Sequence, residues 1–231
     1  MREAFNRKLR ELEEDLVRMG GIVSESISLS IEALKKQDVA LAQQIIDDDD
    51  RVDDFQYDLE NRSLILIATQ QPLASDLRTI ASIISVASEL ERIGDYAEGI
   101  ATITLRIADK PLLKPLIDIP RMAEKVQEML RGSLEAFIAR DVEWTEGIAL
   151  MDNHVDDLYD QVYRELLTFM MEDPRSITRA TYLLWVAHKL ERMADRTTNI
   201  CERIVFMVTG EQQDLNFPVE GEHERIAPDR T

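Results

Sequence analysis

Cysteine, glycine and proline are scarce in this chain of 231 residues, which contains one, eight and seven of them respectively. The single cysteine, Cys201, cannot form an intramolecular disulfide, which favours a reducing compartment. Few glycines and prolines, with three of the prolines confined to 111–120, favour long helices over a strand-rich fold. Because Cys201 lies in a helical pattern near Ile200 and Ile204, we expect a packed core thiol.

Basic residues and long apolar runs are also in short supply. Lys and Arg number 27 against 45 Asp and Glu, a net charge of −18, which argues against nucleic-acid binding and predicts no basic patch for anionic lipid. The longest apolar runs, at 64–68 and 80–87, fall short of the ~18–20 residues that cross a membrane. The charged N-terminus lacks an apolar signal core. We therefore expect a cytoplasmic protein without direct membrane insertion.

Helical periodicity dominates what is present. Apolar residues on one helix face recur every three or four positions from the start: Phe5, Leu9, Leu12, Leu16, Met19 and Val23. The pattern predicts helices at about 3–36, 38–70, 72–107, 120–140, 141–172 and 174–209. Asp38 is expected to cap the second helix, and Pro72 and Pro174 to lie in the first turns of two others.

The sequence repeats itself. ELERIGDYAEGI at 89–100 returns as KLERMADRTTNI one hundred residues later, and the first two helices of the unit return 103 residues later. The sequence thus predicts an all-α fold of two tandem antiparallel three-helix bundles packed side by side. The predicted units are 1–108 and 119–210, joined by a proline-containing linker at 109–118 and followed by a disordered tail at 211–231.

Carboxylates four residues apart occur in both repeats, off the core-facing stripe of each helix. At about 1.5 Å per residue, those of the second and third predicted helices come level roughly 27–29 Å from the turn between them. The same counting brings those of the fifth and sixth helices level. The predicted clusters are Asp49, Asp53, Glu91 and Asp95 in the first bundle, and Asp152, Asp156, Glu191 and Asp195 in the second.

Grouped carboxylates repel one another, and a bound cation would relieve the repulsion. Oxygen ligands favour hard ions such as Mg²⁺, Ca²⁺, Mn²⁺ or Fe³⁺. A solvated helix face is the alternative for any one pair, and Arg92 and Arg192 are alternative salt-bridge partners. A multinuclear-metal enzyme or metal-storage protein is a second functional reading, although Glu-x-x-His occurs only at Glu220–His223.

QQPLASDLR at 70–78 and the twin LERIGD and LERMAD segments resemble the PhoU family of phosphate-signalling accessory proteins, over essentially 1–210. The resemblance implies two three-helix bundles and metal clusters held by the eight carboxylates above, with iron favoured and Mn, Mg, Ca or Zn as alternatives. An Asn often follows the motif Asp by four residues in this family. Asn199 keeps that position and joins the predicted ligands, whereas Gly99 does not. A His often follows the Asp directly, where this chain has Tyr96 and Arg196.

The resemblance also implies a regulator without catalytic residues. Proteins of this family couple a phosphate ABC transporter to a sensor histidine kinase and repress phosphate-starvation genes when phosphate is plentiful. The expected partners are accordingly the transporter ATPase subunit and the kinase, with a homodimer as a further expectation. Recruitment to the inner face of the membrane would then occur through these proteins.

Overall fold

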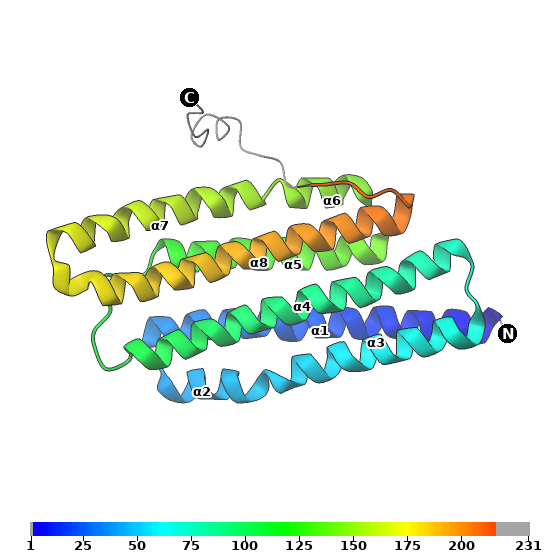
Figure 1. Ribbon diagram of the computed structural model, residues 1–231, viewed down its shortest axis with the longest axis horizontal. Coiled ribbons are helices and arrows are strands. Elements are labelled where there is room, and N and C mark those ends of the chain that lie inside the picture. The colour runs from blue at the N-terminus through cyan, green and yellow to red at the C-terminus, as the bar shows by residue number, and fades with distance from the viewer. Residues whose placement is uncertain (1, 216–231) are drawn as a thin grey trace, which may run out of the picture.

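The computed structural model describes residues 2–215, and every regular element among them is a helix (Figure 1). The first half contains α1 (Arg2–Lys36), α2 (Val39–Asp48), α3 (Asp50–Gln70) and α4 (Ala74–Ile107). The second half contains α5 (Asp118–Ala139), α6 (Val142–Ala149), α7 (Asp152–Glu172), the short 3₁₀ helix η1 (Pro174–Ser176) and α8 (Ile177–Thr209). The tail expected to be disordered lies, from residue 216 on, outside the described residues.

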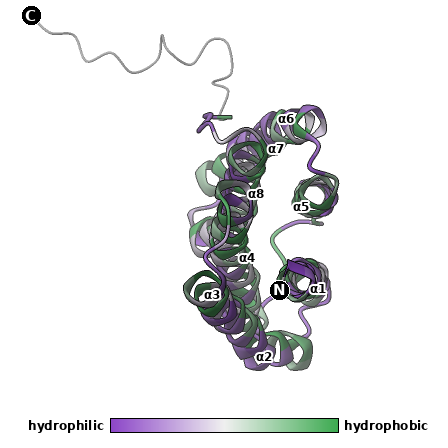
Figure 2. Ribbon diagram, turned by 90° about the vertical axis from the view of Figure 1, so that its right-hand side faces the viewer, coloured by the Kyte–Doolittle hydropathy of each residue, from purple (hydrophilic) through white to green (hydrophobic). Residues whose placement is uncertain are grey.

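The two halves form antiparallel bundles that pack side by side. In each half, two long helices flank a third that is divided into a short and a long segment (Figure 1). Seen end-on in Figure 2, α3, α4, α8 and α7 follow one another in a curved layer, with α1 and α5 on its inner side. The bundles meet where α4 packs on α8 and α1 packs on α5. The predicted all-α class and paired-bundle arrangement are confirmed, whereas the domain boundaries at 108 and 119 stay a prediction.

One continuous apolar core runs through both bundles. It contains the predicted stripe of α1, with Leu16 and Val23 wholly buried, and extends through α4 and α8 to the second half. Cys201 is buried in this core, and burial raises the pKa of its thiol to about 12, which confirms the expected packed thiol. A smaller cluster around Ala33, Ala42 and Ile45 packs α1 and α2 against α4.

The same turn opens the divided helix in both halves. Gln37 (φ 53°) and Arg140 (φ 55°) end α1 and α5 in the left-handed conformation. The next residues are N-caps: Asp38 accepts a hydrogen bond from the Leu41 amide at 3.0 Å, and Asp141 from the Trp144 amide at 2.9 Å. These turns lie 103 residues apart, as the repeat predicts.

Two predicted helices are interrupted, which corrects the expectation of continuous helices at 38–70 and 141–172. The first breaks at Asp49, where the Val52 amide bonds to the Asp49 carbonyl three residues back at 2.8 Å. The second breaks at Leu150 and Met151, and the His154 amide bonds to the Met151 carbonyl at 3.1 Å. Neither break contains Pro or Gly, so the tightened hydrogen bonding left no signal in the sequence. Both breaks adjoin predicted site carboxylates.

The ends of two further helices also differ from expectation. α4 begins at Ala74 rather than at Pro72, with Leu73 as its N-cap, and Pro174 opens η1 rather than α8 itself. Within residues 2–215, no helix has the length and apolarity needed to span a membrane.

Candidate metal centres

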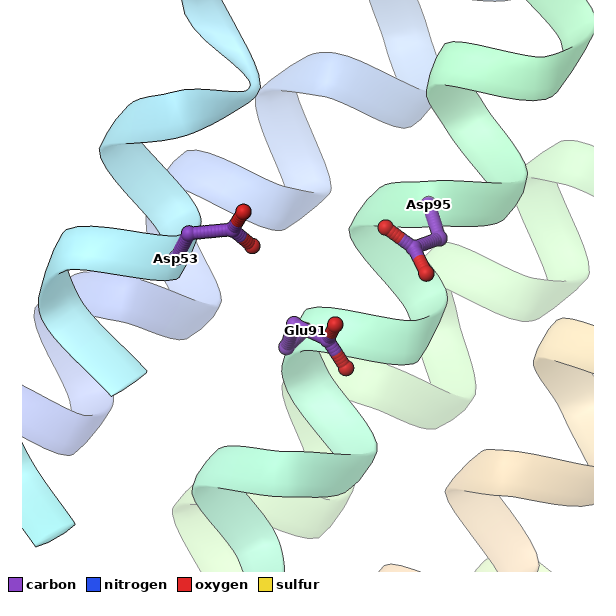
Figure 3. Close-up of side chains that lie close together, drawn as sticks. All are labelled: Asp53, Glu91 and Asp95. Carbon is purple, nitrogen blue, oxygen red and sulfur yellow. The ribbon is translucent and has the colours of Figure 1, made fainter. Parts of the chain in front are cut away.

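The first carboxylate cluster lies where the start of α3 faces the middle of α4. Asp53 from α3 and Glu91 and Asp95 from α4 point toward one another, and one oxygen from each lies within 4.8 Å of the others (Figure 3). Asp53 and Asp95 are exposed and Glu91 is half-buried, so an ion could reach this position from solvent. The structure therefore brings together three of the four carboxylates predicted for this cluster.

Asp49, the fourth, lies at the break between α2 and α3 and belongs to the same electrostatic group. Burial, followed by the charges of Asp95, Glu98 and Asp53, raises its pKa to about 6. The pKa values of Glu91 and Asp95 are also raised, first by burial and then by neighbouring carboxylates. Several negative charges thus oppose one another here, as expected of a site built for a cation.

Gly94 allows the close approach of α3 to α4 at this cluster. A Cβ at Gly94 would stand 3.3 Å from a methyl group of Val52 and 3.6 Å from a carboxylate oxygen of Asp49. A larger side chain would therefore push Asp49 away from the carboxylates of α4. Helix packing therefore explains why a glycine lies between Glu91 and Asp95.

The second cluster combines Asp152 and Asp156 of α7 with Glu191 and Asp195 of α8. Burial, followed by the charges of Asp156 and Asp195, raises the pKa of Asp152 to about 7. Burial and Asp195 likewise raise the pKa of Glu191 to about 7. One oxygen of Asp152 and one of Glu191 are buried without a hydrogen-bond partner in the described part of the chain.

Close contacts with an arginine and a histidine distinguish the second cluster from the first. An Arg192 nitrogen lies 2.5 Å from Asp195, and Nδ1 of His188 lies 3.2 Å from Glu191 without the orientation of a hydrogen bond. Burial, followed by the charge of Arg192, lowers the pKa of His188, which favours the neutral imidazole. Among residues 2–215, only the first cluster gathers three ligand atoms within 4.8 Å. The ion pair of Arg192 with Asp195 gives a reason why the carboxylates of the second cluster do not gather as closely as those of the first.

Asn199, predicted as a ligand, faces the other bundle. Its amide donates to Glu89 of α4 at 3.3 Å, and Arg196 contacts the same carboxylate at 3.5 Å. One repeat earlier in the chain, Tyr96 and Gly99 replace Arg196 and Asn199, and the residue that they meet is Lys189 of α8. The Lys189 ammonium lies over the Tyr96 ring at 5.6 Å and occupies the space that a Cβ at Gly99 would need.

The site contains residues that sequence reasoning missed. Glu98 follows Glu91 and Asp95 at helical spacing, so the sequence contained a signal for it. Lys189, whose charge lowers the pKa of Asp95, comes from the other bundle and gave no signal. His188, exposed on α8, lies one turn before Glu191 and contacts it.

These residues fit a hard divalent or trivalent cation. The donors are carboxylates, and two buried oxygens lack partners within residues 2–215. Burial and mutual repulsion raise the pKa values of five of them: Asp49, Glu91, Asp95, Asp152 and Glu191. A cation bound at either cluster would neutralise the carboxylates and bridge the two helices that carry them.

Comparison with known proteins identifies the architecture. The family model described as the PhoU domain matches the chain twice, at residues 16–104 and 119–204. The chain is 39% identical over 216 residues to a protein of Clostridium acetobutylicum named phosphate-specific transport system accessory protein PhoU homolog, covering 93% of this chain and 99% of that one. It is 42% identical over 205 residues to the Aquifex aeolicus protein of the same name, covering 89% and 93%.

Solved structures agree with these matches. The crystal structure of PhoU from Pseudomonas aeruginosa superposes with a TM-score of 0.85 at 34% identity, over 90% of this chain and 100% of that one. The phosphate transport system regulatory protein PhoU from Streptococcus pneumoniae gives the same TM-score and identity over 91% and 99%.

Proposed function

Because the chain belongs to the PhoU family, we propose that it is a metal-binding accessory protein of a phosphate transport system that represses phosphate-starvation genes when phosphate is plentiful. The observation that carries this proposal is the double match to the PhoU domain together with near full-length relatives named for that transport system. Those names describe accessory and regulatory proteins, which favours a regulator over an enzyme.

Metal binding is supported by the two carboxylate clusters. Bound cations would neutralise the repelling carboxylates and hold α3 against α4 and α7 against α8. The ligands proposed are those predicted from the sequence, with Asn199 requiring a side-chain rotation away from Glu89. Iron is favoured by family resemblance, with Mn, Mg, Ca and Zn as alternatives.

Signalling through protein contacts is the proposed mechanism. The partners are the transporter ATPase subunit and a sensor histidine kinase, reached at the inner face of the membrane from the cytoplasm. The net charge of −18 favours basic partner surfaces and an association rate that falls with salt. A homodimer is a further part of the proposal.

The test is deletion of the gene in its host under abundant phosphate. We expect phosphate-starvation genes to be expressed in the deletion strain and to be silenced again by the wild-type gene. Genes that stay silent, with unchanged phosphate uptake, would refute the regulatory function and favour a metal enzyme or storage protein. A pull-down with the kinase and ATPase cytoplasmic domains tests the partners separately.

Metal dependence is tested in the same strain by complementation. Glu191→Gln/Asp195→Asn removes two proposed ligands, and the control Glu124→Gln/Glu143→Gln removes two exposed carboxylates outside the clusters. We expect the control to restore repression and the ligand variant to restore it only in part. Full repression by a ligand variant that lacks metal by elemental analysis would separate regulation from metal binding.

A further inference from the structure

Four cationic side chains gather at one end of this acidic molecule, although its composition predicts no basic patch. They line a pocket of about 430 Å³ between the C-terminal end of α4, the linker that follows it and the start of α8 (left in Figure 1). Arg106 and Lys110 come from the first half, and Arg175 and Arg179 from the second. Asp109 is the only acidic residue among those that line the pocket.

Hydrogen bonds to backbone carbonyls hold the pocket in place, and they pair none of its cations with a carboxylate. The Gln37 side-chain amide donates to the Ile107 carbonyl at 3.0 Å and to the Lys110 carbonyl at 2.6 Å, which fixes the end of α4. Arg179 donates to the Pro111 carbonyl at 3.3 Å, which ties the linker to α8. Tyr182 forms part of the wall and packs edge-on against an aromatic ring one turn further along α8.

Most of the positive charge in the pocket has no acidic partner. Within residues 2–215, the side chains of Arg106 and Lys110 form no hydrogen bond or ion pair. Arg175 contacts Asp173 through its Nε and its backbone amide, which leaves its terminal guanidinium nitrogens available. Unpaired cations held close together repel one another, so an anion bound among them would be stabilised.

The four cations have no charged counterparts at the equivalent positions of the internal repeat. The internal repeat provides the comparison, because the positions one hundred residues away carry no charge at the opposite end of the molecule: Phe206, Gly210, Ser75 and Thr79. Two cations lie beside those positions, but each is engaged: Arg78 donates to the Met207 carbonyl at 3.5 Å, and Arg140 donates to Thr79 at 3.2 Å and pairs with Glu13 at 2.9 Å. Charge at the four pocket positions is therefore not a shared feature of the two halves.

We propose that this pocket binds a phosphorylated anion. Its volume is that of a small-molecule site. A phosphate group offers three acceptor oxygens and close to two negative charges at neutral pH, so it can engage several guanidinium groups where one carboxylate would satisfy a single one. Tyr182 supplies an apolar face on which the organic part of a phosphorylated molecule would pack. A free phosphate compound and a lipid headgroup share this chemistry.

The experiment compares two double variants that remove the same charge. Arg106→Gln/Lys110→Gln alters the pocket without removing any hydrogen bond or ion pair, so folding should be retained. Arg7→Gln/Arg10→Gln alters two exposed residues of α1 at the other end. Binding of inorganic phosphate, pyrophosphate and ATP is measured by calorimetry with chelator present, so that metal-held phosphate does not contribute. Flotation with phosphatidylglycerol and phosphatidylcholine vesicles tests the lipid source.

We expect at least one phosphate probe to bind, with affinity falling tenfold or more in the pocket variant and less than twofold in the control. Capture only by phosphatidylglycerol vesicles, lost in the pocket variant, would support the site and assign its ligand to a membrane. Absence of binding to the soluble phosphate probes and to phosphatidylglycerol vesicles alike, or equal binding by both variants, would overturn the proposal. Binding of a polyglutamate peptide in place of the phosphate probes would overturn it as well, in favour of an acidic protein segment.

Discussion

Replacement of Asp152 by Asn should stabilise the metal-free protein and weaken its response to metal. The pKa of Asp152 is raised from the ordinary value of 3.8 to about 7, mainly because the carboxyl is buried and then because it faces Asp156 and Asp195. A rise of that size corresponds to about 4 kcal/mol against the charged form at neutral pH. Because the side chain is only half-buried, solvent screening leaves an expected gain of about 1–2 kcal/mol for Asp152→Asn.

The stability gained by Asp152→Asn depends on pH. A carboxyl whose pKa is raised in the folded state binds its proton more tightly there than in the unfolded chain. Its contribution to stability is therefore fully present below about pH 4 and is lost as the pH rises through about 7. Asp152→Asn does not undergo this loss. The variant and wild type should be equally stable near pH 4, and the variant should be more stable at pH 7.5.

Urea unfolding after chelation, at pH 4 and pH 7.5, measures this difference. Added Mn²⁺ at one hundred times its dissociation constant should stabilise the wild type by about 2.7 kcal/mol and the variant by less. Asp160→Asn, an exposed α7 carboxyl paired with Arg164, is the matched control and should show neither effect. A variant that is destabilised at pH 7.5, or that responds to Mn²⁺ as the wild type does, would refute the assignment of Asp152 to a strained cation site.

Other consequences can be measured on the purified protein. Glu191→Gln/Asp195→Asn should lose metal from the second cluster and keep that of the first, and elemental analysis showing unchanged total metal would contradict the ligand assignment. Leu59→Ala removes a wholly buried side chain and should cost about 2–5 kcal/mol in urea unfolding; a cost under 1 kcal/mol would mean that the core collapses around the gap. Asp38→Ala removes the cap of α2 and should cost about 1 kcal/mol, whereas Asp38→Asn, which can still accept the hydrogen bond, should cost much less.

Periodicity and repetition allowed most of the fold to be predicted from the sequence. The buried stripe of α1 and the cap at Asp38 depend on local spacing, and the structure has both as expected. The level placement of Asp53 with Glu91 follows from helical rise and a short turn, which are also local properties. Such features survive in a single sequence because neighbours along the chain determine them.

Features that depend on the meeting of distant segments could not be predicted. The contact of Lys189 with Tyr96 requires knowledge of how α8 lies on α4, and no spacing rule supplies it. The amide of Asn199 turns to Glu89 for the same reason. The break at Asp49 was missed for a different reason, because a shift of hydrogen bonding inside a helix without Pro or Gly leaves no signal in the composition. The grouping of Arg106 with Arg179 in one pocket could not be predicted either, because the net charge of the whole chain is negative.

The contacts between α4 and α8 show how far the duplicated halves have become unequal. Glu89 of the first half meets Arg196 and Asn199 of the second, whereas Lys189 of the second meets Tyr96 and Gly99 of the first. Each half therefore carries the complement of the other half and not of itself. Two copies of the first half, paired about the same axis, would leave Glu89 facing an aromatic ring, with Arg92 of its own helix as its remaining cationic contact. The two matching halves thus meet as unlike partners joined within one chain.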